Sequence, residues 1–151
     1  MQSSNAIRTI QLADAAATQA LGAGLATELG PGAVLLLSGG LGAGKTCLVQ
    51  GLARGLGVDE PVTSPTFALA QHYRAADGRA LVHLDLYRLE SPASADELFH
   101  QELEEAELLG AVMAVEWPER LSRPPAGAWR LALELAGEGR LARLQPPPSA
   151  L

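Results

Sequence analysis

The 151-residue chain has little of several residue types, and each shortage narrows its class. A single cysteine, Cys47, cannot form a disulfide within the chain, which suits a reducing cytoplasm. No apolar run reaches about 18 residues, so no membrane span is expected. Residues 1–12 lack the charged-then-apolar pattern of a signal peptide. We therefore expect a cytoplasmic protein without a membrane partner.

Positive charge is also scarce, and it is supplied almost entirely by arginine. The chain has 11 basic and 17 acidic residues and a formal net charge of −6. Proteins that bind nucleic acid on their own usually have a basic face. We therefore expect this chain to contact RNA only through a partner protein. Lys45 is the sole lysine, and it stands in a glycine-rich loop where a slim point charge suits a narrow phosphate pocket.

Apolar patterning predicts one α/β domain. With 48% hydrophobic residues the chain can bury a core. Helical patterns cover 13–29, 45–56 and 90–110. Strand patterns cover 7–12, 33–38, 67–73, 80–87, 111–118, 130–135 and 140–145. Two pairs of strands flank turn residues and read as hairpins, so we predict a mixed sheet flanked by helices in a single domain over 1–145, with a proline-rich tail over 146–151.

The loop after the second predicted strand matches a phosphate-binding motif. Residues 39–46, GGLGAGKT, fit G-x-x-x-x-G-K-[ST] between a buried strand and a helix. Glycines let consecutive N–H groups point at an anion, and the helix N-terminus adds its positive dipole end. Lys45 can reach the terminal phosphates, and the Thr46 hydroxyl can bind Mg²⁺. The predicted nucleotide contacts are Gly40, Leu41, Gly42, Ala43, Gly44, Lys45, Thr46 and Cys47.

Other residues indicate which nucleotide base is expected and which side chains complete the predicted site. Asn5 is the sole asparagine, so the N-K-x-D loop that reads guanine cannot form and ATP or ADP is expected. Asp85 and Glu116 each end an apolar strand, and either could bind Mg²⁺ while the other orders a water. Thr63, Ser64 and Thr66 offer hydroxyls in a loop that can sense a γ-phosphate.

Other residues have less specific patterns. His83 lies in a strand pattern that predicts burial, and a structural role is favoured over a catalytic one. Trp117 follows Glu116 and packs on the site, on a partner or in the core. Arg88, Arg120 and Arg140 could reach phosphate or a partner, and the sequence does not place them.

Four segments in order, GGLGAGKT, TSPTF, HLDLYRL and VEWPER, resemble the TsaE (YjeE) family of bacterial P-loop ATPases. The resemblance spans about residues 10–144. It implies a small cytoplasmic ATPase that supports formation of threonylcarbamoyladenosine next to the tRNA anticodon. It also implies the TsaB and TsaD proteins as partners, with TsaD carrying the transfer chemistry and ATP turnover resetting the complex.

The resemblance assigns roles residue by residue. It makes Thr46 and Glu116 the Mg²⁺ ligands and Asp85 the Walker B-type acid. It makes the loop that contains Thr66 a switch, so that Lys45, Asp85 and Thr66 form the catalytic set. Arg140 matches a position near the outer face of the nucleotide. Family members often have Asp in place of Gly40 and Thr in place of Cys47.

Two other functions remain open at the level of sequence. One is a small-molecule or nucleotide kinase, although its candidate lid, residues 90–110, is acidic and contains no arginine. The other is a module that binds nucleotide without turnover. For the ATPase we expect little or slow hydrolysis by the chain alone, because no arginine finger is evident in the sequence.

Overall fold

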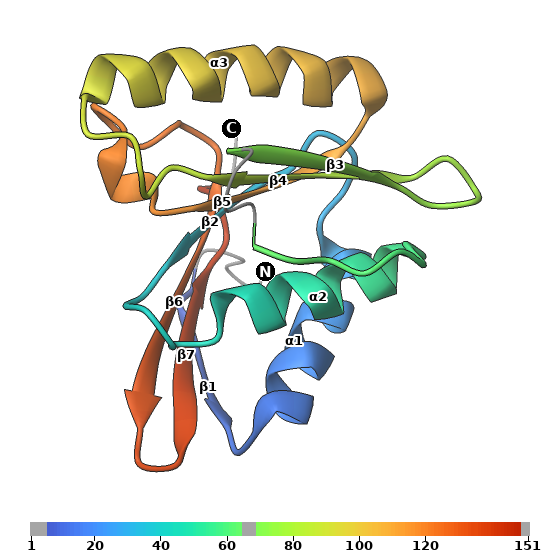
Figure 1. Cartoon of the computed structure of the whole chain (residues 1–151). Helices are drawn as coiled ribbons and strands as arrows, with labels where there is room; N and C mark the ends of the chain where they lie inside the picture. The colour runs from blue at the N-terminus through green and yellow to red at the C-terminus, as the bar shows by residue number, and fades with distance from the viewer. Residues whose placement is uncertain (1–5, 65–68, 149–151) are drawn as a thin grey trace.

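The protein is an α/β sandwich in which helices cover both faces of one mixed sheet (Figure 1). The computed structural model describes residues 6–64 and 69–148, and within them the sheet has seven strands in the order β1-β7-β6-β2-β5-β4-β3. The strands are β1 (Arg8–Leu12), β2 (Val34–Ser38), β3 (Ala70–Arg74), β4 (Ala80–Asp85), β5 (Val112–Glu116), β6 (Trp129–Ala136) and β7 (Gly139–Gln145). The predicted mixed sheet with flanking helices is confirmed.

Three helices and one short 3₁₀ turn complete the described structure. They are α1 (Ala15–Glu28), α2 (Lys45–Leu56), α3 (Pro92–Leu109) and η1 (Pro118–Arg120). The α1 helix begins at Asp14, whose carboxylate accepts a hydrogen bond from the Ala17 amide. The α2 helix ends at Leu56, and Gly57 forms its left-handed C-cap. In the predicted tail, residues 146–148 form no regular element, and 149–151 lie outside the described residues.

Two apolar cores lie on opposite faces of the sheet. Helices α1 and α2 cover one face, where Leu48 and Leu52 pack with Leu37 and Leu133. Helix α3 covers the other face over β4 and β5, where Phe99 is buried. Strands β2, β4 and β5 are apolar on both faces because each face is covered.

Glycine brings α1 and α2 into backbone contact. A Cβ atom at Gly51 of α2 would lie 2.0 Å from the Gln19 carbonyl oxygen of α1. The missing side chain lets the backbones of α1 and α2 approach closely, and these two helices form extensive contacts with each other. The helix that follows the glycine-rich loop is therefore fixed by packing as well as by its own hydrogen bonds.

The sheet topology gathers several carboxyl ends at one edge. Strands β4, β5, β2 and β6 are neighbours and run parallel. The glycine-rich loop leaves the end of β2, and Asp85 and Glu116 end β4 and β5. In open α/β sheets ligands bind outside these carboxyl ends. Residues from three separate segments of sequence thus meet at one place.

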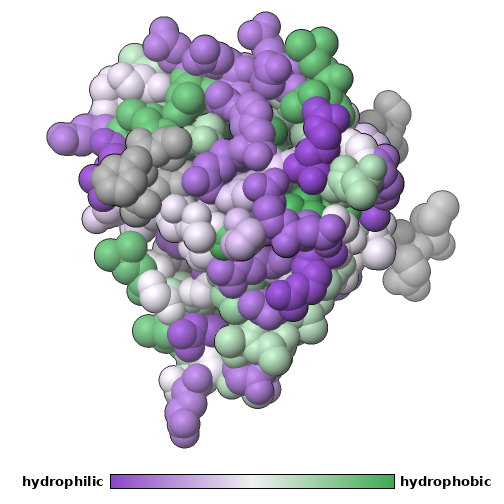
Figure 2. Space-filling model, turned by 45° about the vertical axis from the view of Figure 1, so that its right-hand side comes forward, coloured by the Kyte–Doolittle hydropathy of each residue, from purple (hydrophilic) through white to green (hydrophobic). Residues whose placement is uncertain are grey.

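The surface offers no broad apolar face in the view of Figure 2, where hydrophilic residues are interrupted by separate apolar patches. The exposed large apolar side chains come from different elements: Ile7, Leu41, Tyr87, Leu108 and Leu135. Among the helices of residues 6–64 and 69–148, none combines the length and apolarity that a membrane crossing requires.

Candidate nucleotide-binding site

The loop from Gly39 to Gly44 presents the open N-terminus of α2. Gly44 is the N-cap residue, with φ of 102°, a left-handed conformation that suits glycine. No side chain caps α2 at this end. The first amides of the helix therefore remain donors for an anion, and the helix dipole favours negative charge there. This is the arrangement that the motif predicts.

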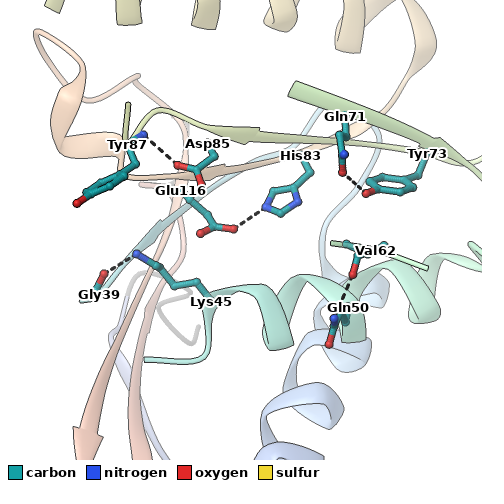
Figure 3. Close-up of polar contacts among 10 residues, drawn as sticks. All are labelled: Gly39, Lys45, Gln50, Val62, Gln71, Tyr73, His83, Asp85, Tyr87 and Glu116. Carbon is teal, nitrogen blue, oxygen red and sulfur yellow. Dashed lines mark hydrogen bonds and ion pairs between the residues drawn. The ribbon is translucent and has the colours of Figure 1, made fainter. Parts of the chain in front are cut away.

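Lys45 lies at the centre of the site with its charge already engaged. Its side chain is largely buried, and its Nζ donates to the Gly39 carbonyl oxygen at 2.6 Å (Figure 3). The same Nζ lies 4.1 Å from the centroid of the Trp117 ring, within cation–π range. The ammonium group has three N–H donors, so it can turn a further donor towards a phosphate oxygen.

Asp85 and Glu116 are direct neighbours in the parallel pairing of β4 and β5. Asp85 is half-buried, and its Oδ1 accepts a hydrogen bond from the Tyr87 amide at 2.9 Å, which fixes the carboxylate at the end of β4. Burial raises the pKa of the Asp85 carboxyl, and the nearby Glu116 charge adds to the increase. Glu116 is buried, and its Oε2 lies 2.6 Å from the Nε2 atom of His83.

A cleft of about 220 Å³ brings the predicted residues together. Its lining includes Leu41, Gly42, Lys45 and Thr46 from the loop and α2, and Asp85 and Glu116 from the strand ends. Ser64, from the predicted sensing loop, lines the same cleft. Thr66, the residue assigned a catalytic role there, lies outside the described residues. Lysine, hydroxyl and two carboxylates thus surround one space.

Arg140 holds the loop from the side of β7. Its Nε donates to the Ala43 carbonyl at 3.1 Å and its Nη2 to the Gly42 carbonyl at 3.0 Å. These two contacts join residues that are nearly a hundred positions apart in the chain. The guanidinium therefore supports the loop conformation, and its predicted contact with nucleotide remains a prediction.

Cys47 lies beside Arg140 in a second hollow on the outer side of the loop, which also includes Thr18 and Glu138. The Cys47 Sγ is 3.4 Å from the Ala15 carbonyl oxygen. Burial raises the pKa of its thiol, so the cysteine is a poor nucleophile. This agrees with a packing position, and the predicted contact of Cys47 with nucleotide stays a prediction.

Sequence reasoning did not place two residues that line the cleft, Trp117 and Arg88. Trp117 has φ of 59°, a strained value for a large side chain, and this turns its ring across Lys45 and onto Tyr87 at 4.7 Å between ring centroids. Arg88 follows the Asp85–Tyr87 turn, and its side chain is exposed. The available sequence signal is the same for both: each closely follows an acid at a strand end and lies at or next to an aromatic residue.

The donor set fits magnesium held mainly by a nucleotide. Within the described ranges, no three histidine, cysteine, aspartate or glutamate side chains form a group able to hold a metal alone. Mg²⁺ at nucleotide sites takes one or two protein oxygens and completes its shell with phosphate and water. Thr46 and Glu116 can supply such oxygens, with Asp85 next to them.

Comparison with known proteins identifies relatives along almost the whole chain. Residues 12–143 match the family model described as threonylcarbamoyl adenosine biosynthesis protein TsaE. The chain is 43% identical over 139 residues to the tRNA threonylcarbamoyladenosine biosynthesis protein TsaE of a Nostoc species, covering 91% of this chain and 85% of that protein. It is 47% identical over 118 residues to the protein of the same name from a Synechocystis species, covering 76% and 73%. The crystal structure of YdiB from Bacillus subtilis is similar, with a TM-score of 0.74, 27% identity, and coverage of 94% of this chain and 86% of that one.

Proposed function

The chain belongs to the TsaE family, and from this premise we propose that it is a slow Mg²⁺-dependent ATPase that supports formation of threonylcarbamoyladenosine next to the tRNA anticodon. The observation that carries the proposal is the shared cleft. The uncapped N-terminus of α2, Lys45, Thr46 and the paired acids Asp85 and Glu116 all border it. A cleft that combines anion-binding amides, a lysine and two carboxylates suits phosphoryl transfer to water. A loop with a purely structural role would not need these groups.

In this proposal the loop amides and the start of α2 hold the phosphates. Lys45 directs an N–H donor to a phosphate oxygen, and in the free protein the Gly39 carbonyl already pairs with its buried charge. The adenosine extends over the outer side of the loop towards the hollow that Cys47 and Arg140 line. ATP and ADP share these contacts.

The strand-end acids support attack by water on the γ-phosphorus. Bound Mg²⁺ offsets the charge that develops on the transferred group. Thr46 and Glu116 would supply the oxygens that hold the metal. Asp85, whose carboxyl pKa is raised, accepts a hydrogen bond from the attacking water and orients it. The water oxygen bonds to the γ-phosphorus as the bond to the β,γ-bridging oxygen breaks; ADP leaves with that oxygen and its electron pair, and the water proton passes to the phosphate or to solvent.

Partner proteins enter the proposal because the cleft opens at an exposed rim. Leu41 is 73% and Tyr87 42% exposed, and Arg88 is exposed beside them. We assign TsaB and TsaD as the proteins that stimulate turnover, with tRNA contacted only within their complex. The net charge of −6 agrees with a protein that does not grip RNA alone.

A kinase is less well supported because the candidate lid is used elsewhere. Helix α3 packs through Ala95, Phe99 and Ala106 against the face of the sheet opposite α1 and α2 (Figure 1). It is therefore committed to the core and does not cover the cleft. No acceptor-binding lid is formed by this segment.

The test is ATP hydrolysis by the purified chain, alone and with TsaB and TsaD. We expect slow release of phosphate alone and faster release with both partners. Lys45→Ala should abolish the stimulated rate, whereas Arg143→Ala, on the exposed side of β7, should leave it unchanged. Rapid turnover by the chain alone, or phosphate transfer to a small acceptor in place of water, would contradict the proposal.

A further inference from the structure

The buried histidine beside the site is only half satisfied. His83 has no exposed surface, and its Nε2 lies 2.6 Å from the Glu116 Oε2 atom (Figure 3). Its Nδ1 atom has no hydrogen-bond partner within the described structure. The sequence favoured a structural histidine, yet a purely structural histidine in a core normally has both ring nitrogens paired. A role in core packing does not explain why His83 pairs through Nε2 with Glu116 alone.

The unpaired nitrogen fixes the direction of the hydrogen bond. A proton on Nδ1 would leave a buried N–H group without an acceptor in the part of the chain that the structure describes. The proton therefore resides on Nε2, which donates to the Glu116 carboxylate. Glu116 receives this donor from a ring that cannot turn, because the ring is enclosed by the core.

Glu116 bridges two environments. It lines the cleft, whereas His83 lies behind it, away from the cleft. In Figure 3 the Glu116 carboxylate lies between the His83 ring and the Lys45 side chain. His83 and Asp85 are two positions apart on β4 and so share one face of the sheet. The same strand supplies the second acid of the site and the donor that holds the first.

The neighbouring acid makes a fixed donor necessary. Asp85 and Glu116 are paired in register, and like charges at this spacing repel each other. A glutamate without a donor would rotate away from Asp85 and from the position where it serves a metal. Carboxylates that bind metals are themselves commonly held by a hydrogen bond of this kind.

We propose that His83 is a positioning residue that fixes the Glu116 carboxylate in the orientation needed to bind the metal of the metal–nucleotide complex. His83 touches neither nucleotide nor metal, and it acts through Glu116. The inference rests on the proposed nucleotide site. It predicts a defect in metal affinity that is separate from nucleotide affinity.

The test measures binding in two ways, without relying on turnover. The first is the Kd of Mn²⁺, by electron paramagnetic resonance, for the protein saturated with ATP. The second is the Kd of ATP in EDTA. His83→Leu should weaken Mn²⁺ binding by roughly 10- to 100-fold and leave the EDTA value unchanged. His83→Gln, which keeps a donor near the position of Nε2, should restore most of the Mn²⁺ affinity.

The chain provides a matched control at the surface. His72 Nε2 also lies 2.6 Å from a glutamate oxygen, in Glu102, but this pair is partly exposed and neither residue lines the cleft. His72→Leu should change neither Kd. In a Glu116→Gln background, His83→Leu should add no further loss, because the two residues act as one unit.

Each outcome decides between the proposals. Wild-type Mn²⁺ affinity in His83→Leu, or an equal added loss in the Glu116→Gln background, would overturn the role of His83 alone. Absence of metal-dependent ATP binding in the wild type would overturn the nucleotide site and the role of His83 together. If His83→Leu does not fold, His83→Asn, whose shorter amide does not reach Glu116, replaces it in the comparison with His83→Gln.

Discussion

Replacing Arg140 tests whether the loop is held in shape by a contact from the far end of the chain. Two of its hydrogen bonds reach the Gly42 and Ala43 carbonyls, at 3.0 and 3.1 Å. The bond to Ala43 is partly buried and the bond to Gly42 is exposed, so a net value of about 1 kcal/mol per bond is an upper value. Arg140→Ala would then destabilise the nucleotide-binding conformation of the loop by about 2 kcal/mol. This corresponds to a roughly 30-fold weaker Kd for ADP.

Calorimetric titration with ADP in EDTA measures this effect without the metal. Arg140→Lys separates two roles. If the guanidinium acts by joining two carbonyls, lysine cannot replace the fork and most of the loss remains. If its charge acts on a phosphate, lysine recovers most of the affinity. Arg143→Ala is the control, since Arg143 pairs with Glu134 in an exposed ion pair. Wild-type ADP affinity in Arg140→Ala would refute the reasoning.

Three further predictions concern stability and reactivity. Gly51→Ala should lower the free energy of unfolding by about 1–3 kcal/mol or more, because its Cβ has no room, whereas Gly24→Ala, with open space around it, should not lower it; urea unfolding measures both. Asp85→Asn should raise the melting temperature at pH 7 and not at pH 3: the raised Asp85 pKa means that the folded protein loses stability as pH rises above the ordinary aspartate value. Equal shifts at both pH values would contradict this cause. Cys47 should react with iodoacetamide more slowly at pH 8 than a free thiol, because burial raises its pKa; mass spectrometry after timed quenching would show equal rates if this is wrong.

The loop and the helix after it were predictable because their signal is local. The glycines, Lys45 and Thr46 all lie within eight consecutive positions, and the apolar periodicity of α2 begins at once. The acids were also predictable as strand ends. The sequence could not show that Asp85 and Glu116 are register partners, because that depends on the order of β4 and β5 in the sheet.

Contacts that depend on tertiary structure were not predictable. The Arg140 bonds to the loop and the His83 bond to Glu116 each join separate strands or loops. Trp117 adopts a positive φ that no local propensity favours, and the surrounding structure holds it there. The histidine was expected to be structural. Its contact with Glu116, and the lack of a partner for Nδ1 among residues 6–64 and 69–148, become apparent only once β4 and β5 are placed side by side.

ATP binding to the purified chain tests the central claim most directly. Calorimetric titration at saturating Mg²⁺ and in EDTA would compare the wild type with Lys45→Met, which keeps the aliphatic stem and removes the charge, with circular dichroism to confirm folding. The account predicts one ATP site per chain, tighter with Mg²⁺ and strongly weakened in Lys45→Met. ATP binding of equal strength in both proteins, or no binding by the wild type, would contradict it.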